Sequence, residues 1–313
     1  MSGLTNYTSQ SLLNWLSGNI SFPVLPSIYC ELFTGAGLDD GTGFTEVSGT
    51  GYTRVQVAGT QTVNGTTAAG QAVLSFGTVG AWITVGMEVR DVTGSGALPT
   101  VPNPPTVLSK TATTVTISAN ATGAGVGATD SIAFSAFGVV SGTGPSQIQN
   151  ITSIGFAQAT GTAGWGTVVA FGLVDGSAGG NLLGWDYLGN FSWLPFSATS
   201  VASGSGAVFT TKAHGYSGAD PVVVTAEYGG TLPTLSQGTL GGVSTTPTIN
   251  YINSVTVATD TFTLNSVSSG QTSGNAIWSS ATGSGLVRKI VQQSIPQNVT
   301  ASFAAAQLTI TSA

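Results

Sequence analysis

Hydrophobic and polar positions alternate along most of the chain with a period of two, which is typical of β-strands. The clearest case is 164-GWGTVVAFGLVDGSAGGNLLGWDYLG-189, where the glycine-rich GSAGG separates two such runs. Its large apolar positions are Val169, Phe171 and Leu173 in the first run and Leu183, Trp185 and Tyr187 in the second. The pattern predicts a β-hairpin whose large side chains pair across the two strands.

A helical pattern occurs once, near the N-terminus, in 5-TNYTSQSLLNWLSG-18. Thr5 or Asn6 can cap the start, and Gly18 can end the helix in a left-handed conformation. The apolar positions that share one stripe are Leu12, Trp15 and Leu16. Because a helix of this length is marginal in water, we expect it to be docked on a larger body.

Three further segments alternate as strands: 27-SIYCELFT-34, 52-YTRVQVAG-59 and 299-VTASFAAAQLTITSA-313. In the first, the only cysteine, Cys30, falls on the same face as Ile28 and Leu32. A single cysteine excludes an internal disulfide, and this position predicts a small buried apolar residue.

Two long segments, 72–137 and 198–285, share an order of parts: a strand, a turn into another strand, a Leu-Pro turn and a final pair of Thr/Val-rich strands. The order indicates two β-modules of similar plan. The alternative is that any Thr-, Val- and Gly-rich β-sequence resembles another, so whether the two segments are true repeats stays open.

Charged residues make up only 6% of the 313 residues, against a usual 25%, and 45 glycines take part of their place. Six Lys and Arg and a net charge of −6 cannot neutralise a series of phosphates, so we predict no nucleic-acid partner. Mean hydropathy is +0.31, yet no run reaches the roughly 18 apolar residues of a spanning helix, which predicts no membrane insertion. The first residues do not resemble a secretion signal, so we expect synthesis in the cytoplasm.

Ionisable side chains offer little catalytic chemistry. A Ser-His-Asp triad would depend on His214, the only histidine, which we interpret as an exposed or turn residue. One histidine and one cysteine cannot form a zinc site. The acidic residues that could pair as in a glycosidase are Asp39, Asp40, Glu46, Asp175 and Asp186, and we interpret them as turn formers.

The stretch DDGTG lacks the spacing of a calcium-binding loop. We therefore predict no catalytic, cofactor-binding or metal-binding residue and no cofactor. Arg288 and Lys289, the one clustered pair of positive charges, either contact an acidic neighbour or begin a solvated strand. Aromatic residues are expected as core or interface anchors more than as sugar-stacking platforms. The tryptophans are Trp15, Trp82, Trp165, Trp185, Trp193 and Trp278.

Four stretches together resemble a family of tailed-bacteriophage proteins described as tail-fibre proteins. They are IYCELFT (28–34), TEVSGTGYTR (45–54), WGTVVAFGLVDGSAGGNLL (165–183) and SFAAAQLTITS (302–312), in the family's order, after a short helix. With their connections they cover a little under half of the chain. The chain departs from the family in size, because two long segments would interrupt its compact core. The resemblance supplies no catalytic residue.

Pattern and resemblance together imply a mainly β protein with a β-sandwich-like core, one short N-terminal helix and two inserted β-modules. We expect a discontinuous core formed by 1–71, 138–197 and 286–313. The segments 72–137 and 198–285 form the inserted modules.

The resemblance implies a non-enzymatic structural component of a tailed-phage virion, made in the bacterial host cytoplasm. One interpretation is a tail-fibre or adhesin protein, whose modules touch host surface glycans. A second is a capsid decoration protein that stabilises the head, and a third, less favoured, is an enzyme that degrades envelope polysaccharide. The expected partners are other virion proteins and copies of the chain itself, in a homo-oligomer.

Overall fold

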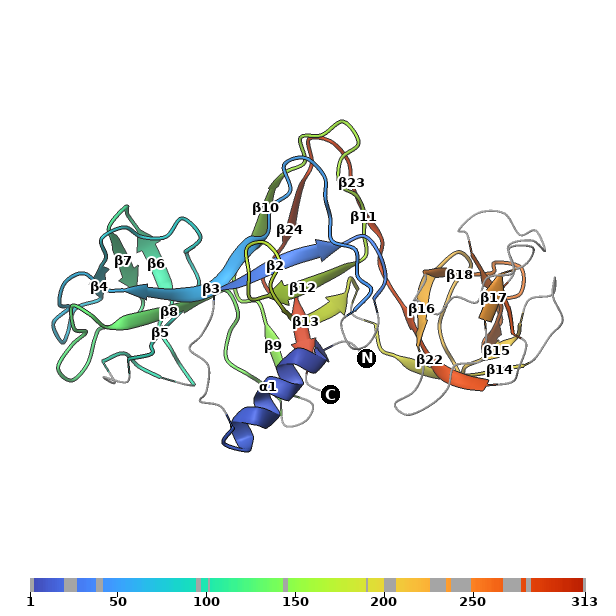
Figure 1. Cartoon of the computed structure of the whole chain (residues 1–313), viewed down its shortest axis with the longest axis horizontal. Coiled ribbons are helices and arrows are strands. Elements are labelled where there is room, and N and C mark those ends of the chain that lie inside the picture. The colour runs from blue at the N-terminus through green and yellow to red at the C-terminus, as the bar shows by residue number, and fades with distance from the viewer. Residues whose placement is uncertain are drawn as a thin grey trace.

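The computed structural model describes residues 3–19, 27–37, 42–93, 97–100, 102–142, 146–189, 191–199, 207–225, 235–237, 249–266, 277–279 and 283–311. These residues form short antiparallel strands and one helix, α1 (Asn6–Leu16), arranged in a central body with a lobe on either side (Figure 1). The predicted mainly β class with a short N-terminal helix is confirmed.

A seven-stranded sheet runs through the central body (Figure 1). Its strands, in spatial order, are β1 (Gly3–Leu4), β13 (Leu182–Tyr187), β12 (Ala170–Val174), β2 (Ile28–Phe33), β3 (Val55–Thr62), β8 (Ser131–Ser135) and β5 (Glu88–Asp91). The sheet therefore brings strands from the start, the middle and the 72–137 segment of the chain into one layer.

Three two-stranded ribbons complete the central body. They pair β10 (Ile154–Gln158) with β24 (Thr300–Phe303), β11 (Gly166–Val168) with β23 (Gln293–Ile295), and β9 (Gln147–Gln149) with β25 (Thr309–Thr311). Each ribbon joins the end of the chain to its middle, so the C-terminal strands close the central body.

The lobe formed by 72–137 shares both sheet and core with the central body. Its own three-stranded sheet has the order β4 (Val73–Ser75), β7 (Thr114–Ile117) and β6 (Val107–Lys110), while β5 and β8 extend the central sheet. One apolar cluster joins Leu74 and Val115 of this lobe to Leu32 and Phe171 of the central body. The predicted domain boundaries stay a prediction.

A second seven-stranded sheet builds the opposite lobe. Its order is β19 (Thr261–Phe262), β15 (Phe209–Thr210), β14 (Leu194–Ala198), β22 (Gly283–Lys289), β16 (Pro221–Thr225), β18 (Asn250–Ile252) and β20 (Leu264–Asn265), with the pair β17 (Leu235–Gln237) and β21 (Ile277–Ser279) beside it. Phe196, Phe209 and Phe262 lie in a separate core, and the Phe209 and Phe262 rings stack at 5.5 Å.

The predicted hairpin is formed by β12 and β13, but its register differs from the expectation. Phe171 lies opposite Asp186, whereas Trp185 lies opposite Gly172. Because cross-strand partners share a face, Trp185 is on the other side of the sheet from Phe171. Because Gly172 has no side chain, it makes space for its neighbours. A Cβ there would lie 2.8 Å from Phe33 Cε2 and 2.6 Å from Leu182 Cδ1.

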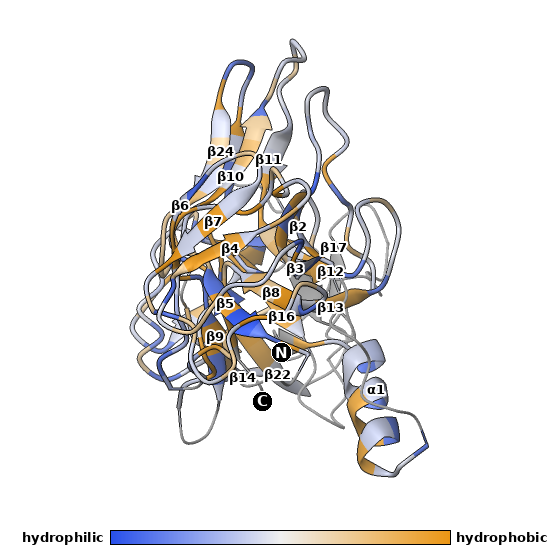
Figure 2. Cartoon of the chain, turned by 90° about the vertical axis from the view of Figure 1, so that its left-hand side faces the viewer, coloured by the Kyte–Doolittle hydropathy of each residue, from blue (hydrophilic) through white to orange (hydrophobic). Residues whose placement is uncertain are grey.

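Thr5 caps the start of the helix, because its hydroxyl accepts a hydrogen bond from Thr8 N, and Gly18 adopts φ +75° after the helix ends, as predicted. The helix is docked less closely than expected. None of its residues is buried, and its first turn is attached to β13 through the Thr8 hydroxyl, which donates to Leu183 O at 2.7 Å. In Figure 2, α1 stands away from the sheets.

The closing segment was expected to be one strand but forms two, β24 and β25. Ala306 between them adopts φ +66°, and buried Asn150 binds the turn. The Asn150 amide donates to Ala304 O at 2.8 Å, and its oxygen accepts from Leu308 N at 2.8 Å. These bonds replace strand pairing within the turn.

Candidate functional site

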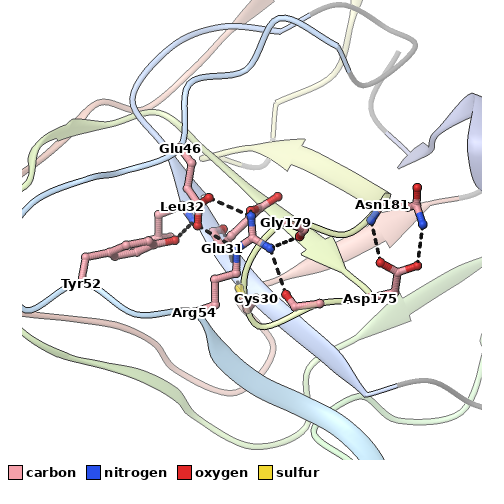
Figure 3. A network of polar contacts seen from close by, with 10 residues as sticks. Cys30, Glu31, Leu32, Glu46, Tyr52, Arg54, Asp175, Gly179 and Asn181 are labelled. Carbon is pink, nitrogen blue, oxygen red and sulfur yellow. Dashed lines mark hydrogen bonds and ion pairs between the residues drawn. The ribbon is translucent and has the colours of Figure 1, made fainter.

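A concentrated polar site lies where β2, the 42–54 loop and the β12–β13 turn meet, and its centre is Arg54 (Figure 3). The guanidinium binds the Glu46 carboxylate through two parallel bonds, Nε to Oε1 at 2.8 Å and Nη2 to Oε2 at 2.7 Å. Nη2 also lies 2.5 Å from Glu31 Oε2 on β2. Such a planar fork-to-carboxylate arrangement is strong and directional.

The remaining nitrogen of Arg54 reaches the hairpin turn. Nη1 donates to Gly176 O at 2.9 Å and also to Gly179 O. The turn is closed by Asp175, whose carboxylate accepts from Asn181 N at 2.6 Å and from Asn181 Nδ2 at 2.9 Å. Asp175 is thus a turn former, as predicted, and Arg54 fastens the turn to β2 and the loop.

Tyr52 completes the site. Its hydroxyl accepts a hydrogen bond from Leu32 N at 2.9 Å, in the middle of β2. Its ring packs edge-on against Trp165 at 5.3 Å and stacks on Phe156 at 6.1 Å. The stretches TEVSGTGYTR and WGTVVAFGLVDGSAGGNLL therefore contact each other through Tyr52, Arg54 and the turn glycines.

Burial determines the protonation of this site. Desolvation raises the pKa of the Glu31 carboxyl to about 7, although the charge of Arg54 opposes the shift, and the charge and hydrogen bond of Glu46 add to it. The pKa of Arg54 is raised chiefly by its hydrogen bonds to Glu46, and burial raises that of Tyr52 above its usual range. Glu31 is 3% exposed, so its carboxyl is inaccessible to a substrate. We interpret the site as a structural clamp.

Sequence reasoning did not identify Glu31 as part of this site. The available signal was a carboxylate within the apolar strand IYCELF, because a buried charge requires a partner. Cys30 beside it is fully buried as predicted, and desolvation raises the pKa of its thiol well above its usual range. Asp39 and Asp40 lie outside the described residues.

His214 directly follows the turn at 212–213, which agrees with one of the two expectations, but it is not exposed, because only 7% of it is accessible. Its Nδ1 accepts from Tyr216 N at 2.9 Å, and its ring stacks on Tyr216 and meets the edge of Phe262. Its Nε2 is buried and has no hydrogen-bond partner among the described residues. The packing of two aromatic rings explains the burial, and none of these contacts brings a serine or aspartate to the imidazole.

Arg288 and Lys289 contact acidic residues of their own chain and do not begin a solvated strand. Arg288 is 3% exposed and its Nη1 lies 2.5 Å from Asp186 Oδ1, while Lys289 Nζ lies 2.8 Å from Asp220 Oδ1. Arg288 also lies over the ring of Trp193 at 5.8 Å. The Arg288 contact fixes β22 to the end of β13, and the Lys289 contact fixes it to the residue that precedes β16.

The tryptophans differ in how far they are exposed. Trp165 and Trp185 are buried, Trp82 and Trp193 are half-buried, and Trp15 on α1 is 39% exposed. Within the described ranges, no three His, Cys, Asp or Glu residues gather in a way that could hold a metal ion. No helix among the described residues is both long and apolar enough to cross a membrane.

Comparison with known proteins gives one family. Residues 3–98 match the model of the family described as Podophage GP4 fiber I protein gp80. The matched region contains α1, β2, the Arg54 loop and β3, and with them the stretches 28–34 and 45–54, whereas 165–183 and 302–312 lie outside it. No curated protein and no solved structure matches the chain significantly. The match over residues 3–98 supports a phage structural protein of the fibre type.

Proposed function

We propose that the chain is a non-enzymatic structural component of the virion surface of a tailed phage, of the tail-fibre type, and that it contacts the host surface. The match of residues 3–98 to a phage fibre family carries this proposal. Its proposed partners are other virion proteins and copies of the chain itself.

The use of the charged groups supports a structural role. Arg54, Arg288 and Lys289 each pair with carboxylates of the same chain, and the partners of Arg288 and Lys289 are far away in the sequence. Charges engaged in this way fix loops and strands and are poorly placed for proton transfer to a substrate.

The exposed helix supports assembly with a partner. Leu13 and Leu16 on α1 are 63% and 65% exposed, and the helix contains no charged residue. A helix of 11 residues that buries none of its side chains gains little from tertiary packing. Contact of these leucines with a neighbouring subunit or virion protein would supply the packing that the helix lacks within its own chain.

The number of copies per particle tests the proposal. Quantitative gel densitometry of purified virions, with the known copy number of the major capsid protein as reference, should give a few to a few dozen copies. Hundreds of copies would instead identify a capsid decoration protein, and absence from finished particles would contradict a virion component. Release of reducing sugar from host polysaccharide by the purified chain would contradict the non-enzymatic assignment.

A further inference from the structure

A half-open cleft of about 550 Å³ lies in the central body, between the β12–β13 hairpin and the C-terminal strands. The C-terminal strands contribute Gln293 of β23, Val299, and the whole of β24. On the other side are Phe171, Tyr187 and Gly189. A cleft of this volume is in the range that holds a small ligand.

The floor of the cleft is apolar and partly aromatic. Phe171 and Phe303 lie with ring centroids 5.9 Å apart, and Phe303 is half-buried. Ile295 and Leu308 are buried beside them. Phe171 is also buried, so the half-buried Phe303 supplies the accessible aromatic surface of the floor, which can meet the C–H face of one ligand ring.

The rim carries hydroxyl and amide groups. Thr300 and Ser302 are exposed on β24, and Gln293 and Gln307 are exposed beside them. Gln307 uses its oxygen to accept from Ala304 N at 2.7 Å, which leaves its amide hydrogens available. The Gln293 amide donates to Ser294 O at 3.2 Å, which leaves its side-chain oxygen available as an acceptor. The rim therefore offers donors and acceptors together, the combination that hydroxyl groups require.

The cleft has almost no net charge. Asp186 is the only charged residue among those described in its lining, and its Oδ1 lies 2.5 Å from Arg288 Nη1 and accepts from Tyr187 N at 2.7 Å. An anionic or cationic ligand would lose its hydration without gaining a free counter-charge.

We propose that this cleft binds a neutral oligosaccharide of two or three sugar rings. Sugar rings present C–H faces to the aromatic floor and hydroxyls to the amide and hydroxyl rim, and they carry no charge. The proposal adds a ligand class to the proposed function. It rests on that function because it treats the chain as a surface protein of a phage.

Saturation-transfer NMR and titration with the full chain test the site. The probes are maltotriose, cellotriose, mannotriose and N-acetylchitotriose, with sialyllactose as the charged comparison and a neutral tripeptide as the non-sugar comparison. At least one neutral trisaccharide should bind, and it should bind more tightly than either comparison.

Three variants locate the binding. Ser302→Trp should fill the cleft and weaken binding about tenfold or more, and Gln293→Ala should weaken it severalfold. Ser109→Trp, at an exposed strand position in the other lobe, should bind as the unaltered chain does. Thermal melting confirms that each variant is folded.

Failure of all four neutral sugars to bind, tighter binding of the tripeptide or the sialylated sugar, or unchanged binding by a folded Ser302→Trp variant would overturn the proposal. Each of these outcomes is independent of the copy number in virions, so the cleft proposal can fail while the structural role stands.

Discussion

Arg54 and Glu46 share two parallel hydrogen bonds, of 2.8 and 2.7 Å, while the same guanidinium lies 2.5 Å from Glu31. One arginine therefore neutralises two carboxylates of unequal exposure, since the Glu31 side chain is 4% exposed and that of Glu46 is 34% exposed. The consequences of its removal differ for the two acids, because only Glu31 would be left as a buried charge.

Replacing Arg54 by methionine should destabilise the protein strongly. Loss of one member of a buried ion pair costs about 3–5 kcal/mol, because the remaining charge is uncompensated. Chemical denaturation at pH 8 measures the loss. Lys212→Met, at an exposed position, is the control and should change the free energy of unfolding by no more than about 0.5 kcal/mol. Equal effects of the two substitutions would contradict the clamp.

Glu31 should make stability fall as pH rises towards neutrality. Its folded-state pKa of about 7 exceeds the ordinary value of 4.5, so the folded protein binds the proton more tightly than the unfolded chain between these two values. The contribution of Glu31 to the free energy of unfolding therefore decreases as pH rises through this window.

The Glu31→Gln variant tests this sign, because it cannot ionise. Melting temperatures at intervals from pH 4.5 to 8 should fall less steeply with pH in the variant than in the unaltered protein. Glu46→Gln, which alters the more exposed acid on the same guanidinium, should keep most of the slope. A Glu31→Gln variant with an unchanged slope would refute the assignment.

A side chain at Gly172 should be poorly tolerated. An added Cβ would lie 2.6 Å from Leu182 Cδ1 and 2.8 Å from Phe33 Cε2, so Gly172→Ala should cost about 1–3 kcal/mol by overpacking. Gly155→Ala is the matched control, because no atom of the described residues, apart from its two chain neighbours, lies within 4 Å of a Cβ on that strand glycine. Thermal denaturation of both variants gives the comparison, and equal stability would contradict the packing described for the hairpin.

Polar substitution on α1 should affect association more than folding. Leu13→Ser combined with Leu16→Ser alters side chains that are 63% and 65% exposed, so the melting temperature of the isolated chain should hardly change. Incorporation into virions, measured by complementation of a phage lacking the gene, should fall. Exposed Val255→Ser, in the opposite lobe, is the control. Normal incorporation of the double variant would exclude the helix as an assembly surface.

Local patterns allowed the sheet-rich class, the helix limits and the strand at 27–34 to be predicted, because alternation and capping depend on neighbours in sequence. The Arg54 clamp could not be derived in this way. It requires Glu31, the loop that carries Glu46, and the 176–179 turn to meet in space. The bridge between Phe33 and Glu46 brings the loop to β2, and pairing of β2 with β12 brings the turn.

Other differences have equally specific causes. The break between β24 and β25 places Ala306 at φ +66°, which no glycine or asparagine at that position signals, and the buried Asn150 that stabilises it is more than 150 residues away. His214 is buried because Tyr216 and Phe262 pack on its ring, and such packing has no periodic pattern.

The pairing of β14 with β22 has an evolutionary consequence. Leu194 and Val287 lie directly opposite each other, so the chain leaves the central body and returns to it at adjacent points. Exchange of the segment between them would keep these two adjacent points of attachment, provided that the incoming unit also covers Trp185 and Tyr187, which share a buried cluster with Val223 of β16. Recombination at these two positions would let a phage lineage acquire a new outer part while keeping the framework that holds it.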